Sequence, residues 1–209
     1  MGELIMKPYF YLKIILDRLL AFIAIILFSP LFLLLAILIK LDSRGPVFFR
    51  QRRIGIQKKE FQILKFRTMK IEAPKNTPTH LLQNPKQYIT KLGAFLRKYS
   101  LDELPQLINI FNGEMSVVGP RPALWNQYDL IAERDKYNSN AIRPGLTGWA
   151  QVNGRDELEI DVKAQFDGEY VQKMSLLFDI KIVWKTFANI FNGKGIVEGV
   201  THKKTNIGV

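Results

Sequence analysis

The chain has 209 residues, of which 47% are hydrophobic, 23% charged and 11% aromatic. This length and apolar content fit one domain with a substantial core and exclude global disorder. Cysteine is absent, and His80 and His202 are the only histidines. A disulfide framework, a zinc–thiolate centre, an iron–sulfur cluster and a cysteine nucleophile are therefore excluded. Any metal must be held by oxygen ligands, which favours Mg²⁺, Mn²⁺ or Ca²⁺.

The net charge is +11, from 30 basic and 19 acidic residues. This balance predicts an anionic partner, which can be nucleic acid, a membrane surface or a phosphorylated substrate. The basic excess is concentrated between Ser43 and Lys70, where Glu60 is the only acid. Because this stretch directly follows an apolar run, its cations are placed to attract anionic lipid, by about 1 kcal/mol each.

The apolar run extends over residues 19–39, between Arg18 and Lys40. As a helix it would be about 31 Å long, close to the thickness of the hydrocarbon core of a bilayer. It is too long for a signal peptide and too uniformly apolar for a core helix, so we expect it to enter a membrane. Pro30 predicts a kink, and the hydroxyl of Ser29 can satisfy part of the interrupted hydrogen-bond ladder.

The charges on both flanks of this run bear on its topology. Both flanks are basic, and the positive-inside rule places basic flanks in the cytoplasm. A helix that enters the membrane, bends at Ser29-Pro30 and returns to the same face satisfies this rule. An ordinary transmembrane helix kinked at the proline is the alternative, and composition alone does not separate the two.

The remaining chain, residues 43–209, predicts one domain with short strands and several helices. In chain order, we expect strands at 47–49 and 61–69, a loop at 73–84, a helix at 88–99, a helix from Ser100 to Gly113, a strand at 115–118, a rigid turn at 119–122, a helix at 123–136, a glycine-rich loop at 143–155, and helices at 157–173 and 176–191. The last helix has an aromatic stripe, which we interpret as core or membrane-facing packing. The pentapeptide Asn-Ile-Phe-Asn-Gly at 109–113 and 189–193 predicts left-handed helix caps.

The acidic pair Asp102-Glu103 is the first candidate for chemistry. Ser100 followed by Glu103 has the spacing of a capping box, so the pair can simply begin a helix. The alternative uses the same geometry: a carboxylate at a helix start, with Arg97 just upstream, can attack phosphorus or hold Mg²⁺ near free backbone amides. Pro105 removes an early helical hydrogen bond, so the helix can begin a residue or two later.

Three further arginines are candidates for binding an anion. Arg121 lies between two prolines, which suits a preorganised phosphate clamp. Arg143 and Arg155 flank a loop with glycines at 145, 148 and 154, where the backbone can approach a ligand. Each of the three can equally be a solvated surface residue.

Several long segments, in this order, resemble a known family, the bacterial sugar transferases (the monotopic polyprenol-phosphate phosphoglycosyl transferases) in their small form. The segments are Ser29-Pro30, the Lys-Phe-Arg-Thr-Met sequence at 65–69, the Ser-Leu-Asp-Glu-Leu-Pro-Gln-Leu sequence at 100–107, the Val-Gly-Pro-Arg-Pro sequence at 118–122, and the segment 143–155 from Arg-Pro-Gly to Asn-Gly-Arg. The resemblance extends from about residue 13 to residue 198.

The resemblance implies a predominantly helical α+β fold. It implies a re-entrant membrane helix in residues 1–42, kinked at Ser29-Pro30, and a membrane-associated catalytic domain in residues 43–209. It also implies a monotopic enzyme on the cytoplasmic face of the bacterial inner membrane.

The implied reaction moves a phosphosugar from a UDP-sugar to polyprenol (undecaprenyl) phosphate and releases UMP. Asp102 would be the nucleophile that forms a covalent phosphosugar intermediate, which predicts ping-pong kinetics. Glu103 would be its partner acid, and Mg²⁺ at Asp102 the cofactor. Arg97 and Arg121, with Lys65 or Arg67, would neutralise the diphosphate.

Two other functions compete with this expectation. A membrane-anchored basic module that binds nucleic acid or anionic lipid explains the charge and the apolar run, but not the acidic pair beside Arg97. A glycosyltransferase that moves the sugar without its phosphate would release UDP. The resemblance favours a transferase that binds membrane lipid and no nucleic acid; the identity of the sugar and the oligomeric state stay open.

Overall fold

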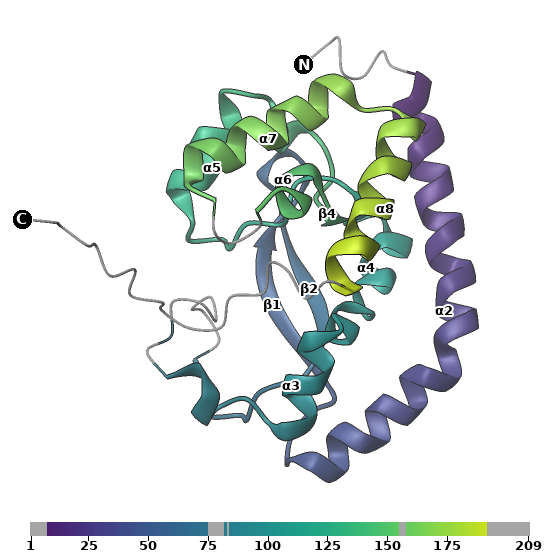
Figure 1. Cartoon of the computed structure of the whole chain (residues 1–209), viewed down its shortest axis with the longest axis vertical. Coiled ribbons are helices and arrows are strands. Elements are labelled where there is room, and N and C mark those ends of the chain that lie inside the picture. The colour runs from purple at the N-terminus through teal and green to yellow at the C-terminus, as the bar shows by residue number, and fades with distance from the viewer. Residues whose placement is uncertain (1–7, 75–81, 83, 155–157, 192–209) are drawn as a thin grey trace, which may run out of the picture.

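The computed structural model describes residues 8–74, 82, 84–154 and 158–191. Figure 1 shows one long helix, α2 (Pro8–Asp42), along one side of a small domain of short helices and strands. The described part is mostly helical, with two separate two-stranded sheets. The expected helical α+β fold with a long apolar N-terminal helix is therefore confirmed.

Helix α2 packs on the domain along a narrow stripe only. Ala21, Leu35 and Ile39 are buried on this stripe, at intervals that return to the same helix face. Only 11% of the most apolar window of α2 is buried. A core helix of a soluble protein would be buried over most of its surface. Helix α2 instead exposes most of its apolar side chains, and no described residue covers them.

Pro30 lies inside α2, and the helix continues through it. Proline has no N–H, so the carbonyl of Ile26 loses its normal helical donor. The hydroxyl of Ser29 donates to this carbonyl at 2.8 Å. The expected compensation by Ser29 is confirmed, and Figure 1 shows that the axis of α2 changes direction along its length.

Strands β1 (Phe48–Ile54) and β2 (Glu60–Phe66) form an antiparallel hairpin in the middle of the domain (Figure 1). A single 3-10 turn, η1 (Ile56–Lys58), joins them. Strand β1 is longer than predicted, because alternation continues through its charged residues: Gln51 is buried, whereas its neighbours Arg50 and Arg52 are exposed.

The expected helix from Ser100 to Gly113 is divided in two, so the capping-box interpretation is wrong. Helix α3 (Lys91–Lys98) follows the 3-10 turn η3 (Pro85–Gln87). Ser100 then adopts the left-handed conformation, with φ 55°, and its side chain caps nothing. Pro105 explains the division, since a proline ring clashes with the carbonyl four residues earlier. A 3-10 turn, η4 (Leu101–Glu103), precedes Pro105, and α4 (Gln106–Asn112) follows it.

Strand β3 (Ser116–Val118) pairs in parallel with β4 (Gly145–Thr147), which lies inside the segment predicted to be a loop. A Cβ atom on either Gly145 or Gly148 would overlap the backbone of Gly119. These glycines therefore allow two backbone segments to approach each other. The glycine pattern alone predicts an approach of the backbone to a ligand.

The C-terminal half of the described chain supplies four α-helices. They are α5 (Tyr128–Asp135), α6 (Trp149–Val152), α7 (Ile160–Lys173) and α8 (Leu176–Phe191), with a 3-10 turn, η5 (Ser139–Ala141), after α5. Tyr170 and Ile182 are buried in the core that α7 and α8 share with β3. The stripe on α8 is not core, since Leu177 and Trp184 are 79% and 75% exposed.

Candidate active site

Asp102 lies at the centre of the candidate site, on the 3-10 turn between α3 and α4. It is 8% exposed, and its carboxylate forms no hydrogen bond or ion pair with any residue that the structure describes. Burial raises the pKa of Asp102; the charges of Lys65, Arg97 and Arg121 oppose that rise, and the charge of Glu103 adds to it. A buried carboxylate without a hydrogen bond is costly to maintain, and such groups are concentrated at functional sites.

Glu103, in contrast, holds two of the surrounding cations. Its Oε1 atom accepts a hydrogen bond of 2.7 Å from Nζ of Lys65 and lies 3.5 Å from Nη1 of Arg121. Burial lowers the pKa of Lys65, while the charges of Glu103 and Asp102 oppose this shift. The two acids therefore have different contacts. Glu103 orients Lys65 and Arg121, and the carboxylate of Asp102 is left for another partner.

Arg97 reaches the site from α3. Hydrogen bonds hold this helix against Thr68, which follows β2 in the chain. The Nε atom of Arg97 donates to Oγ1 of Thr68 at 2.9 Å, and the amide of Thr90 donates to the carbonyl of Thr68 at 3.1 Å. The side chain of Thr90 also caps α3 by accepting from the amide of Gly93. A Cβ atom on Gly93 would overlap the carbonyl of Thr68, so only glycine permits this approach.

Arg121 is positioned by an extended segment that runs beside β1. Leu124 pairs with Arg53 in an antiparallel bridge, and the amide of Ile54 donates to the carbonyl of Ala123 at 2.9 Å. Nη1 of Arg53 also donates to the carbonyl of Pro122 at 2.9 Å. Because Leu124 is held in this bridge, the segment stays extended and α5 begins later than predicted.

The structure therefore brings together Asp102, Glu103, Lys65, Arg97 and Arg121, which come from four separate segments. It places Arg67 elsewhere: its Nη2 atom donates to the carbonyls of Ile39 and Ser43, at the end of α2. Arg67 thus closes the last turn of α2 instead of facing Asp102.

Two other arginines from the sequence analysis do not join this group. Arg143 donates from Nε to the carbonyl of Gly113, at the far end of α4. Arg155 lies outside the described residues.

Sequence reasoning missed two residues that hold the site together, Arg53 and Thr68. Arg53 was counted with the membrane-proximal charges, although the alternation along β1 separates it from the exposed Arg52. The role of Thr68 had no local signal, because its partners Arg97 and Thr90 lie more than twenty residues away.

Gln106, one turn after Asp102, is 2% exposed, and its Nε2 atom has no hydrogen-bond partner among the described residues.

The donors of the site can be compared with the requirements of Mg²⁺. The described residues contain no group of three or more acidic or histidine side chains that could hold a metal by themselves. Mg²⁺ commonly takes one or two carboxylates and completes its coordination with phosphate oxygens and water. The carboxylate of Asp102, which has no described partner, fits this mode, whereas a site made only of protein ligands does not.

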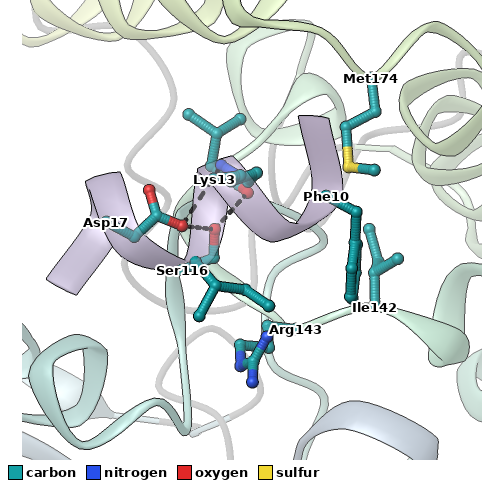
Figure 2. A pocket seen from close by; sticks show the side chains of 9 residues that line it. Phe10, Lys13, Asp17, Ser116, Ile142, Arg143 and Met174 are labelled. Atoms are coloured by element: carbon teal, nitrogen blue, oxygen red, sulfur yellow. Dashed lines mark hydrogen bonds and ion pairs between the residues drawn. The ribbon is translucent and has the colours of Figure 1, made fainter. Parts of the chain in front are cut away.

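A second polar cluster lies where the first turns of α2 meet α7, α8 and β3. Asp179 accepts hydrogen bonds from Tyr9 at 2.7 Å, Lys13 at 2.5 Å and Tyr170 at 2.8 Å. Figure 2 shows the neighbouring contacts of Lys13 and of Ser116 with Asp17. Because these groups satisfy one another, the cluster attaches α2 to the domain.

Comparison with known proteins shows the family of this chain. The family model described as "Bacterial sugar transferase" matches residues 8–193. The chain belongs to this family.

Three relatives illustrate the range of the family. The chain is 42% identical to the exopolysaccharide production protein ExoY of Rhizobium meliloti, over 86% of this chain and 85% of that protein. It is 41% identical to the UDP-glucose:undecaprenyl-phosphate glucose-1-phosphate transferase of Escherichia coli, over 85% of this chain and 39% of that protein. It is 39% identical to the UDP-N-acetylgalactosamine-undecaprenyl-phosphate N-acetylgalactosaminephosphotransferase of Aeromonas hydrophila, over 93% of this chain and 47% of that protein. The chain thus spans less than half the length of the last two relatives.

Proposed function

We propose that the protein transfers a phosphosugar from a UDP-sugar to polyprenyl phosphate, giving a polyprenyl diphosphate-sugar and UMP. The observation that carries this proposal is the buried Asp102 carboxylate, which has no described hydrogen-bond partner and lies among the charges of Lys65, Arg97 and Arg121. The names of the relatives support the reaction class. Two of them name different sugars, glucose and N-acetylgalactosamine, so the sugar in this reaction stays open.

The first proposed step is attack by a carboxylate oxygen of Asp102 on the phosphorus that carries the sugar. A bond forms between this oxygen and phosphorus, and the bond from phosphorus to the bridging oxygen breaks. UMP leaves with the electron pair of that bond, and the phosphosugar stays on Asp102. The desolvated carboxylate favours this step, because no hydrogen bond to a described residue has to be broken before attack.

In the second step a phosphate oxygen of the polyprenyl phosphate attacks the same phosphorus. The bond to Asp102 breaks, the carboxylate is regenerated, and a diphosphate links the lipid to the sugar. Because the two substrates react in separate steps, one site can serve a soluble nucleotide and then a membrane lipid. This order of steps predicts ping-pong kinetics.

The cations provide positioning and charge neutralisation, which phosphoryl transfer requires more than acid–base chemistry. We assign Lys65, Arg97 and Arg121 to the diphosphate. Glu103 keeps Lys65 and Arg121 in place through Oε1. Asp102 would be the protein ligand of Mg²⁺, which would supply positive charge against the leaving group.

We further propose that α2 enters the cytoplasmic leaflet, bends at Pro30 and returns. Its exposed apolar surface and its basic flanks support this placement. Helix α8 lies beside α2 in Figure 1 and also exposes large apolar residues. A site at the membrane surface would meet the lipid phosphate at the depth of the headgroups.

The test is nucleotide release from the detergent-solubilised full-length chain, with Mg²⁺, polyprenyl phosphate and a panel of UDP-sugars. We expect UMP as the product with at least one donor, and sustained turnover only when the lipid is present. Release of UDP would instead identify a simple glycosyl transfer. Binding of lipid or nucleic acid without any nucleotide release would favour the basic binding module.

Two variants test the role of Asp102 in this assay. We expect Asp102→Asn to abolish UMP release. Asp161→Asn is the matched control, because Asp161 is exposed on α7 and the chemical change is the same. Activity of Asp102→Asn near that of the control would remove Asp102 as the nucleophile.

A further inference from the structure

Two arginines meet at the far end of α4 from Asp102. Arg143 donates from Nε to the carbonyl of Gly113, at 2.7 Å. A Cβ atom on Gly113 would collide with the guanidinium of Arg18, which comes from α2. Both guanidinium groups therefore lie against the same glycine, which has φ 81° and ends α4.

These two cations are poorly neutralised by the described residues. Arg18 forms no hydrogen bond or ion pair with any residue that the structure describes, and Arg143 uses only Nε. A guanidinium has five N–H donors, so most donors of the pair are available. Burial, with the charge of Arg18, lowers the pKa of Arg143, whereas the charge of Asp17 opposes this shift.

Asp17 is the acid whose charge acts on Arg143, but it has other partners. Its Oδ2 atom accepts from Ser116 at 2.5 Å and lies 3.4 Å from Nζ of Lys13. Figure 2 shows the guanidinium of Arg143 directed away from these three side chains. An external anion would satisfy the open donors and screen the repulsion between the two arginines.

The surroundings indicate that this anion belongs to a lipid. Arg18 is the last charged residue before the apolar run of α2, and Leu19 beside it is 52% exposed. Phe22, one helical turn further, stacks on Phe111 of α4 with 5.8 Å between ring centroids. Both rings are nearly half exposed, so an apolar wall borders the two cations. Inorganic phosphate has no apolar part that could pack against this wall.

We infer that Arg18 and Arg143 bind the phosphate group of a membrane lipid, whose chain lies along Leu19, Phe22 and Phe111. The inference rests on the proposed membrane placement of α2. The site is separate from the catalytic one, because the seven residues of α4 extend about 10 Å between them. The lipid can be a phospholipid that fixes the depth of α2, or polyprenyl phosphate held before it reaches Asp102.

The test measures lipid binding to the full-length chain in an uncharged detergent, by native mass spectrometry. Three probes are titrated separately: short-chain phosphatidylglycerol, short-chain polyprenyl phosphate and inorganic phosphate. We expect one saturable site for at least one lipid and none for inorganic phosphate at the same concentration. Preference for phosphatidylglycerol identifies a structural phospholipid, and preference for the polyprenyl compound identifies an acceptor site.

The variants are Arg18→Gln, Arg143→Gln and, as the matched control, Arg52→Gln. Loss of a charge-assisted contact should weaken lipid binding roughly ten- to hundredfold in the first two. Arg52 is an exposed arginine on β1 with Glu60 and Trp125 as partners, so its replacement removes only the general attraction of one cation for anionic lipid and should weaken binding about fivefold at most. Arg143→Lys keeps a cation at Gly113, and partial recovery in this variant separates a lost contact from a misfolded chain.

The inference is overturned if Arg18→Gln binds lipid as the wild type does, if Arg52→Gln loses as much affinity, or if inorganic phosphate saturates the same site. Arg18 is exposed, so its replacement does not disturb the core. Phosphatidylglycerol is not a substrate of the proposed reaction, so an error in that reaction would not affect the titration with this lipid.

Discussion

Asp102 and Glu103 are neighbours in the chain, yet their environments differ. Glu103 shares Oε1 with two cations, whereas Asp102 is buried without a described hydrogen bond. Because burial raises the pKa of Asp102, folding disfavours its ionised form. A group with a raised folded-state pKa costs stability once the pH exceeds the pKa of the unfolded chain. The ionised carboxylate of Asp102 therefore lowers the free energy of unfolding.

This argument predicts the stability of the inactive variant. Asp102→Asn keeps the shape of the side chain but removes the buried charge, so we expect its melting temperature at pH 8 to equal or exceed that of the wild type. Thermal unfolding of both proteins in the same detergent measures this. A decrease of several degrees would show that the surrounding cations stabilise the carboxylate by more than burial costs.

The charges around Asp102 predict how the pH profile of UMP release responds to substitution. Attack requires the ionised carboxylate, so the rate falls as the pH drops through the pKa of Asp102. Lys65→Met removes a cation that lowers this pKa, and the acid limb should move to higher pH. Glu103→Gln removes an anion that raises it, and the limb should move to lower pH.

Single-turnover UMP release over a range of pH values measures the position of this limb. Lys58→Met is the control, because Lys58 pairs with Asp135 at an exposed position. If both site variants moved the limb in the same direction, a group other than Asp102 would control the acid side of the profile.

At the scale of elements, β1 and β2 act as a platform that carries two cations. Lys65 projects from β2, and Arg53 of β1 holds the carbonyl next to Arg121. Arg53→Ala should therefore act through Arg121. We expect Arg121→Ala to raise the KM for the UDP-sugar about ten- to hundredfold, and Arg53→Ala to raise the same parameter by less.

Steady-state kinetics of both single variants and of the double variant test this coupling. If Arg53 acts through Arg121, the double variant should be no worse than Arg121→Ala alone. Arg52→Ala, at the neighbouring exposed position, should leave KM unchanged. Additive losses in the double variant would give Arg53 an independent role.

Helix α2 depends on one local device, the Ser29–Pro30 pair. Pro30→Ala restores a donor for the carbonyl of Ile26, which Ser29 now serves at 2.8 Å. We expect a straighter helix that favours spanning the membrane, with its N-terminal side transferred across. The chain has no cysteine, so a single cysteine introduced at Lys7 reports its side by accessibility labelling. A cytoplasmic label in Pro30→Ala would mean that the proline does not set the topology.

The elements also show what sequence patterns can predict. Helices α7 and α8 were expected almost at their observed bounds, because their patterns are long and their ends are local. The expected helix at 123–136 begins five residues late, because Leu124 pairs with Arg53, 71 residues upstream. In the site, sequence motifs pointed to Asp102 and Arg121. The contacts of Thr68 and Arg53 are with residues far away in the chain, so no local sequence pattern predicts them. Such long-range pairing cannot be recognised in a single sequence.

At the scale of the molecule, polar contacts attach both ends of α2 to the domain, and between them only a narrow apolar stripe of the helix packs on it. Near its start, Lys13 and Tyr9 bind Asp179 of α8; at its end, Arg67 binds the carbonyls of Ile39 and Ser43. These attachments fix which face of α2 is turned outward. The domain and the apolar surface of α2 therefore keep one relative orientation, which a reaction on a lipid phosphate requires.

Removing Asp179 tests this attachment. Asp179→Asn leaves Lys13 with Asp17 as its remaining acidic contact in the described cluster, and breaking a buried ion pair commonly costs about 3–5 kcal/mol. We expect a marked fall in the free energy of unfolding, with partial recovery in the double variant Lys13→Met/Asp179→Asn, where no unpaired cation is buried. Asp135→Asn breaks an exposed pair and should cost less than about 1 kcal/mol. Equal effects of Asp179→Asn and Asp135→Asn in chemical denaturation would show that α2 is held by its apolar stripe alone.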